Sequence, residues 1–125
     1  MRLLLDTHVV LWWLNDSPQL GQTARDAIAA PANMVYVSAV SVWETVLKHS
    51  LGKLEIPDNW TEVLADEPFL QLSVTWAHTI GVGQLPDLHR DPFDRLLLAQ
   101  AIAENLTIVT HDETIFRYPV PVLRT

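Results

Sequence analysis

The chain has 125 residues and no cysteine, which excludes disulfides, thiolate metal sites and cysteine nucleophiles. Apolar residues make up 49% and charged residues 18% of the sequence, so a disordered chain is excluded as well. The net charge of −7 repels bare phosphate, and a nucleic-acid partner therefore requires metal cations or a basic protein to reverse the local field.

Short apolar stretches alternate with helical segments along the whole chain. In chain order we expect a strand at 3–5, helices at 8–14 and 23–30, a strand at 34–38, helices at 40–51 and 58–64, a strand at 70–73, a helix at 75–82, a loop at 84–90, a helix at 93–105, and strands at 107–110 and 120–123. This alternation predicts an α/β fold with a parallel sheet. The first strand is apolar throughout, as in a central strand buried on both faces, while Pro119 and Pro121 mark the last one as an edge strand.

No linker, repeat or change in composition divides the sequence, so we expect one domain over residues 1–125. The longest apolar runs are far shorter than the roughly 20 residues of a membrane span. The first ten residues, MRLLLDTHVV, contain an acid within the apolar stretch, which is not typical of a signal peptide. We therefore expect a cytoplasmic protein.

Acidic residues lie beside the predicted strand ends. Asp6 directly follows the first strand, and Asp112 comes two residues after the strand at 107–110. Asp91 and Asp94 begin the longest helix, and Glu44 lies in the helix after the second strand. Because ligands of open α/β sheets bind beyond the carboxyl ends of the strands, these acids could converge on one site.

Each acid also has a purely structural interpretation. Asp6 could cap the helix that follows it, and Asp91 with Pro92 resembles a helix N-cap. Asp94 could merely complement the helix dipole, and Asp112 could start a turn. For Asp91 we favour the capping role.

Glu44 has a mixed setting. It can pair with Lys48 one helical turn further on, as acids on solvated helix faces often do. However, Val40, Leu47 and Leu51 share its stripe of the helix. A carboxylate on an apolar stripe needs a partner, so this spacing favours a functional acid.

Taken together, the acids predict a metal site. Several carboxylates gathered at one sheet edge cannot all stay ionised without a partner. A hard divalent cation such as Mg²⁺ or Mn²⁺ prefers carboxylate oxygens and activates water beside phosphoryl groups. This is the chemistry of metal-dependent nucleases, and the cations would also supply the positive field that the chain lacks.

Three segments carry a family resemblance: LLLDTHVVLWWL, VSAVSVWETVLK and DPFDRLLLAQAIAENLTIVTHD. In this order they resemble PIN-domain proteins, in particular the VapC-type toxins of toxin–antitoxin pairs. The resemblance implies a three-layer α/β/α sandwich with a central parallel sheet and an endoribonuclease that depends on Mg²⁺ or Mn²⁺. It also implies a cognate antitoxin that blocks the site, and usually a homodimer.

The resemblance assigns the metal-holding and catalytic role to Asp6, Glu44, Asp94 and Asp112. Before Asp112 this chain has His111, where many relatives have asparagine, so the match is weakest there. Asp91 is typical of one branch of the family and is an accessory candidate.

Further accessory candidates flank these acids. Thr7 could orient a metal-bound water or cap a helix, and Ser38 could contact phosphate or cap the next helix. Arg95 could bind RNA phosphate or the antitoxin, although we favour a salt bridge. His89 could assist proton transfer, but a histidine in an exposed loop is more often idle.

The tryptophans have structural interpretations first. We expect Trp43 to pack in the core beside Glu44. Trp12 and Trp13 are adjacent and cannot face the same core, so one of them could serve an interface. Stacking on nucleobases is the less favoured alternative.

Two other classes of function share features with this sequence. A catalytically silent PIN-like interaction module remains the alternative, although the intact set of acids argues against it. A phosphoacceptor signalling domain is expected to use a lysine after its last strand, and no lysine follows Lys53. DNA cleavage stays open, because a metal cluster does not distinguish the sugars. The sequence does not choose among transfer, ribosomal and messenger RNA.

Overall fold

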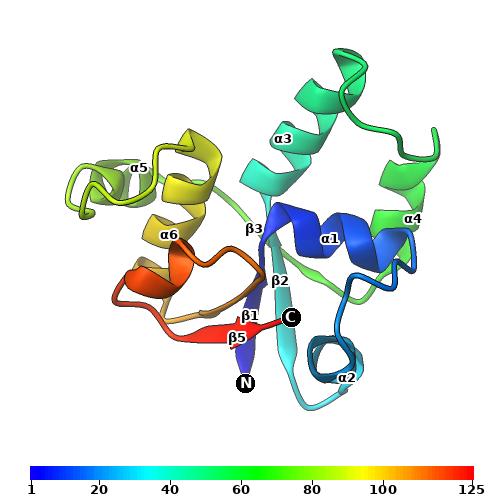
Figure 1. Ribbon diagram of the computed structural model, residues 1–125, viewed down its shortest axis with the longest axis horizontal. Coiled ribbons are helices and arrows are strands. Elements are labelled where there is room, and N and C mark those ends of the chain that lie inside the picture. Colours follow the sequence, from blue (N-terminus) through cyan, green and yellow to red (C-terminus); the bar gives the residue numbers. More distant parts are fainter.

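Five parallel strands form the central sheet of the computed structural model, which describes residues 1–125 (Figure 1). In chain order they are β1 (Arg2–Leu5), β2 (Met34–Ser38), β3 (Leu70–Leu72), β4 (Thr107–Thr110) and β5 (Val122–Arg124). Their order in the sheet is β3-β2-β1-β4-β5, and Leu4 of β1 lies opposite Tyr36 and Ile108. The first strand is therefore central, as the sequence predicts.

The helices cover both faces of this sheet. They are α1 (Thr7–Leu14), α2 (Gln22–Ala29), α3 (Ala39–Ser50), α4 (Trp60–Asp66), α5 (Trp76–Val82) and α6 (Pro92–Glu104), with a short 3₁₀ helix, η1, at Ile115–Arg117. Figure 1 shows α1, α2 and α4 on one side of the strands and α5 and α6 on the other. The predicted three-layer α/β/α sandwich is confirmed. None of the helices combines the length and the apolar character that crossing a membrane requires.

The central strand divides the core into two halves. Leu3 and Leu5 pack with the residues of α1 and α2, whereas Leu4 packs with Leu97 and Leu98 of α6. All three leucines of β1 are fully buried, because side chains alternate between the two covered faces of a strand. Each contributes roughly 1.5–3 kcal/mol of burial free energy, so β1 is firmly fixed and Asp6 extends from a rigid strand.

Local signals set most element boundaries. Helix α6 begins at Pro92 after the N-cap Asp91 and ends at Glu104, where the C-cap Asn105 has a left-handed φ of 55°. Helix α4 begins at Trp60, two residues later than expected, with Asn59 at its N-cap. The last strand is an edge strand as predicted, but it begins at Val122, since Pro119 and Pro121 have no N–H for a ladder.

The exposure of residues on and just after α3 contradicts the sequence prediction. Trp43 is 58% exposed rather than part of the core, and Leu51 is 59% exposed. Figure 1 shows why: α3 rises away from the carboxyl edge of the sheet, so its later turns have no layer above them. Only the first two members of the stripe, Val40 and Glu44, are buried, and the ring of Trp43 instead meets Phe93 edge-on at 4.8 Å between centroids.

Candidate metal centre

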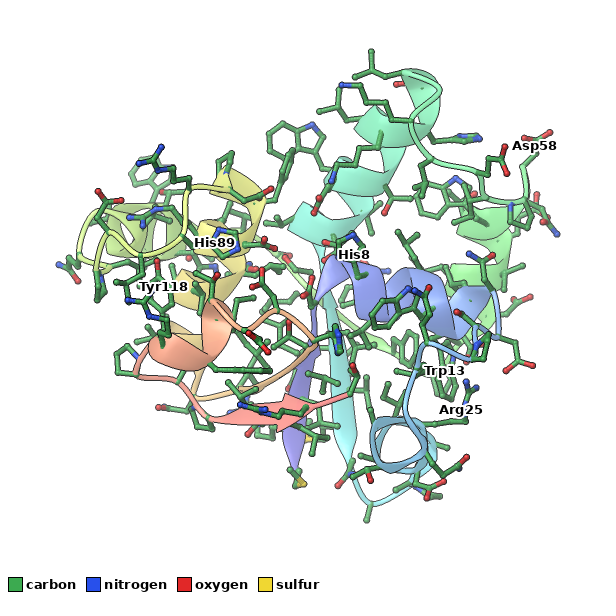
Figure 2. All side chains as sticks on the ribbon, viewed as in Figure 1. His8, Trp13, Arg25, Asp58, His89 and Tyr118 are labelled. Carbon is green, nitrogen blue, oxygen red and sulfur yellow. The ribbon has the colours of Figure 1, made fainter.

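The carboxyl edge of the sheet brings together the segments that carry the predicted acids. Strand β1 leads through Asp6 into α1, and β2 leads through Ser38 into α3. Asp94 lies in the first turn of α6, and Asp112 follows β4. Figure 2 shows the labelled His8, at the start of α1, and His89, before α6, at this edge.

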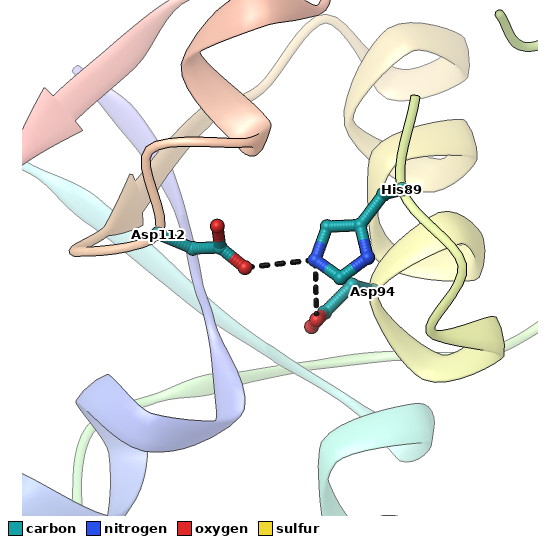
Figure 3. Close-up of side chains that lie close together, drawn as sticks. All are labelled: His89, Asp94 and Asp112. Carbon is teal, nitrogen blue, oxygen red and sulfur yellow. Dashed lines mark hydrogen bonds and ion pairs between the residues drawn. The ribbon is translucent and has the colours of Figure 1, made fainter. Parts of the chain in front are cut away.

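Asp94 and Asp112 meet at a histidine (Figure 3). The Nε2 atom of His89 lies 2.8 Å from Asp112 Oδ2 and 3.1 Å from Asp94 Oδ2. The ligand atoms of these three side chains all lie within 4.8 Å of one another. The prediction of an idle histidine in an exposed loop is wrong. The His89 side chain is only 15% exposed and forms the centre of this cluster.

Asp6 is buried beside the cluster. Its Oδ2 accepts a hydrogen bond of 2.6 Å from the hydroxyl of Thr110, and its backbone N–H donates to Val109. Burial raises the pKa of Asp6, the Thr110 hydrogen bond opposes that shift, and the charge of Glu44 adds to it. Thr110 was not predicted as a site residue, and the available signal was a hydroxyl at the end of the strand that follows the longest helix.

Glu44 is 4% exposed and faces the same region. Its Oε2 accepts a hydrogen bond from Lys48, as the helical spacing predicts, and this bond raises the pKa of Lys48. Its Oε1 is buried and has no hydrogen-bond partner. A buried carboxylate oxygen without a partner is costly, so this atom is one that a cation would satisfy.

The two remaining acids differ in their electrostatics. Burial, followed by the charges of Asp6 and Asp91, raises the pKa of Asp94 from 3.8 to about 7. Burial also disfavours the ionised form of Asp112, but the hydrogen bonds from His89 and from Thr114 outweigh it and lower the pKa of Asp112. The cluster therefore pairs one readily ionised acid with one that resists ionisation, as carboxylates sharing a site do.

Three accessory candidates have structural hydrogen bonds. Asp91 caps α6 by accepting the N–H of Asp94 at 3.0 Å, which confirms its capping role. Ser38 is fully buried and caps α3 by accepting the N–H of Val40. Thr7 is 4% exposed and its hydroxyl donates to Ser41.

Arg95 departs from the predicted salt bridge. Its guanidinium donates to the backbone carbonyls of Val82, Pro86 and His89, at 3.1 to 3.3 Å. It therefore ties the loop before α6 to the helix rather than pairing with an acid. Asp112, in turn, does start a turn, because its Oδ1 accepts the N–H of Thr114 at 2.8 Å.

The donor set fits a hard divalent cation. Apart from His89, every candidate ligand is a carboxylate, and carboxylate oxygens suit Mg²⁺ and Mn²⁺. The unpartnered Oε1 of Glu44 and the raised pKa of Asp94 both indicate negative charge that the chain itself does not balance. Asp6 and Glu44 lie outside the tight group of His89, Asp94 and Asp112, close enough for their charges to act on Asp94.

The raised pKa of Asp94 predicts how stability depends on pH without metal. In the unfolded chain this carboxyl titrates near 3.8 and in the folded protein at about 7, so between these values the folded state binds more protons. Its stabilising contribution is therefore complete below pH 4 and is lost as the pH rises through 7. We expect the free energy of unfolding in EDTA to fall by about 1–2 kcal/mol more in wild type than in Asp94→Asn between pH 5.5 and 7.5.

Urea denaturation of both proteins at the two pH values measures this difference. Asp112 does not interfere, because a lowered pKa affects stability only at more acidic pH. Equal losses of unfolding free energy in both proteins would show that the pKa of Asp94 is not raised in the folded state.

The chain is similar to known proteins along most of its length. The family model described as PIN domain matches residues 3–121. A curated protein of Mycobacterium tuberculosis (strain ATCC 25618 / H37Rv), named Ribonuclease VapC22, is 32% identical, and the match covers 96% of this chain and 95% of that protein.

Two solved structures are similar in fold. One is VapBC2 from Rickettsia felis bound to a DNA fragment from their promoter, with a TM-score of 0.76, 21% identity, and coverage of 99% of this chain and 98% of that chain. The other is DNA-bound VapBC from Salmonella typhimurium, with a TM-score of 0.74, 14% identity and the same coverages.

Proposed function

The chain belongs to the PIN domain family, and we propose that it is a metal-dependent endoribonuclease of the toxin type that hydrolyses RNA phosphodiester bonds. The observation that carries this proposal is the buried, unpartnered Oε1 of Glu44, together with the charges of Glu44 and Asp6 that act on Asp94 beside Asp112. The name of the M. tuberculosis relative, a ribonuclease, supports RNA as the substrate.

Four carboxylates would hold the cation: Asp6, Glu44, Asp94 and Asp112. When bound, Mg²⁺ or Mn²⁺ supplies an activated water and positive charge beside the phosphate under attack. The hydroxyl of Thr110 fixes the Asp6 carboxylate by its 2.6 Å hydrogen bond. No side-chain nucleophile is needed, and the chain has no cysteine to supply a thiolate.

Lys48 has a supporting role in this proposal. Its ammonium group neutralises part of the charge of Glu44, and it lies near enough to Asp91 and Asp94 to feel their charges. In a chain of net charge −7, a cation held at this point also reduces repulsion between the acids and the RNA backbone.

An antitoxin is the proposed protein partner, because the similar solved structures include VapBC assemblies. An apolar groove of about 460 Å³ between β3, α3 and α4 offers an antitoxin segment a docking surface, with Trp43, Leu64 and Phe69 among its lining residues. An antitoxin arginine entering the carboxylate cluster would block the site. We also propose a homodimer, for which light scattering on the free protein is the direct measurement.

The function is tested on purified protein free of antitoxin. Total RNA is incubated with the protein in EDTA, and then with Mg²⁺, Mn²⁺, Ca²⁺ or Zn²⁺ restored. We expect no cleavage in EDTA, strong recovery with Mg²⁺ or Mn²⁺, and weak recovery with Ca²⁺ or Zn²⁺, because the site offers hard oxygen ligands.

Two outcomes would contradict the proposal. Full cleavage in EDTA would exclude the metal mechanism. No cleavage with any metal, together with tight binding of a partner protein, would instead favour the catalytically silent interaction module.

A further inference from the structure

His89 lies at the centre of the acid cluster, yet the proposed mechanism gives it no task. Its Nε2 atom contacts Asp94 and Asp112 at 3.1 and 2.8 Å, and no other side chain contacts both of these acids. This imidazole could either bind the cation itself or orient the carboxylates that bind it.

The hydrogen bond made by the other ring nitrogen, Nδ1, decides between these two roles. The backbone N–H of Asp91 donates a hydrogen bond of 3.1 Å to His89 Nδ1. A backbone amide is always a donor, so Nδ1 must present its lone pair, and in the neutral ring the proton lies on Nε2. To ligate a metal, Nε2 would have to lose that proton and Nδ1 would have to gain one, which would set two N–H groups against each other.

The loop that carries His89 is held in place by two further side chains. The Tyr118 hydroxyl accepts the N–H groups of Leu88 and His89, at 3.2 and 2.7 Å, and donates to the carbonyl of Pro86. Arg95 donates to the carbonyls of Pro86 and His89. Because Tyr118 is buried and its hydroxyl holds the loop backbone, the loop and the imidazole it carries have a fixed position.

We propose that His89 is a positioning residue: its Nε2–H donates to Asp112 Oδ2, and the same nitrogen contacts Asp94 Oδ2, so that the ring holds the two carboxylates in the orientation that one cation requires. The terminal torsion of an aspartate is soft, so without His89 the Asp94 carboxylate is free to rotate and Asp112 keeps only its Thr114 hydrogen bond. The Nε2–H hydrogen bond to Asp112 Oδ2, with Asp94 Oδ2 in contact with the same nitrogen at 3.1 Å, leaves lone pairs on both carboxylates for the cation and limits their rotation. The inference depends on the metal site proposed above.

The test measures metal binding directly. Isothermal titration with Mn²⁺ is carried out on wild type, His89→Ala, His89→Gln and the control His49→Ala, whose histidine lies by the exposed Asp58. We expect the Kd for Mn²⁺ to rise by about 10–100-fold in His89→Ala, as for other residues that orient metal ligands. A glutamine amide places an N–H close to the position of Nε2, so His89→Gln should recover most of the affinity, and His49→Ala should match wild type.

A second readout follows the imidazole proton. In ¹⁵N NMR spectra of the full chain, His89 should show the Nε2–H tautomer both in EDTA and with saturating Mg²⁺. Transfer of the proton to Nδ1 on addition of Mg²⁺ would show that Nε2 is a metal ligand and would overturn the inference.

The binding outcomes separate this inference from the function it depends on. Equal Mn²⁺ affinities of wild type and His89→Ala would overturn the positioning role alone. If wild type itself bound no Mn²⁺, the metal site and the positioning role would both fail. A loss of melting temperature in His89→Ala with unchanged Kd would show a merely structural residue.

Discussion

Asp94→Asn should lower RNA cleavage by about 10²–10³-fold at saturating Mg²⁺. A cation beside a phosphoryl group contributes several kcal/mol of transition-state stabilisation, and each 1.36 kcal/mol corresponds to a factor of ten in rate. Asparagine keeps the shape of Asp94 but loses the charge. Initial rates on a defined RNA, with wild type and variant at the same metal concentration, give this ratio.

The control is Asp58→Asn, because the Asp58 side chain is fully exposed and lies outside the acid cluster. It makes the same change of charge and should keep the rate of wild type. If both variants lost activity equally, net charge rather than ligation would explain the effect. If neither did, Asp94 would have only its helix-terminal role.

Metal should raise the melting temperature of wild type by about 10 °C at a hundredfold excess over Kd. Binding to the folded state alone stabilises by RT ln(1 + [L]/Kd), or about 2.7 kcal/mol at that excess. With an unfolding entropy of about 2.1 cal/mol/K per residue, the 125 residues convert this free energy into the stated shift. Thermal melts in EDTA and in Mn²⁺ measure it.

The same melts on Asp94→Asn complete the experiment. The variant should shift much less with Mn²⁺, and in EDTA at pH 7.5 it should be no less stable than wild type, since burial and like charges hold the pKa of Asp94 at about 7. A helix-dipole acid would behave in the opposite way, with a loss of about 0.3–1 kcal/mol in the variant and no metal effect in either protein. Equal metal shifts in the two proteins would remove Asp94 from the ligand set.

Much of the fold could be predicted from the sequence because its signals are local. The apolar run of β1, the proline and aspartate at the start of α6 and the prolines near β5 each act within a few residues. Helix α6 illustrates this, since its cap and first turn agree with the prediction. Boundaries shifted where caps were weak, as at Trp60, and η1 is a single turn that no periodicity reveals.

The position of α3 could not be predicted in this way. Its apolar stripe is typical of a buried helix face, yet Leu47 and Leu51 are exposed because the helix extends past the sheet that would cover them. A hydrophobic pattern records which face a helix could bury, but burial depends on whether another layer lies against that face.

By itself the sequence determined the order of the elements, the central strand, and the acids beside the strand ends and within α3. Only the tertiary structure decided which side chains meet: His89 with Asp94 and Asp112, and Thr110 with Asp6. These partners are 5, 23 and 104 positions apart in the chain. The physical reason is that capping and strand burial act over a few residues, whereas a contact between carboxylate and donor depends on how β1, β4 and the loop before α6 pack together, which no local pattern records.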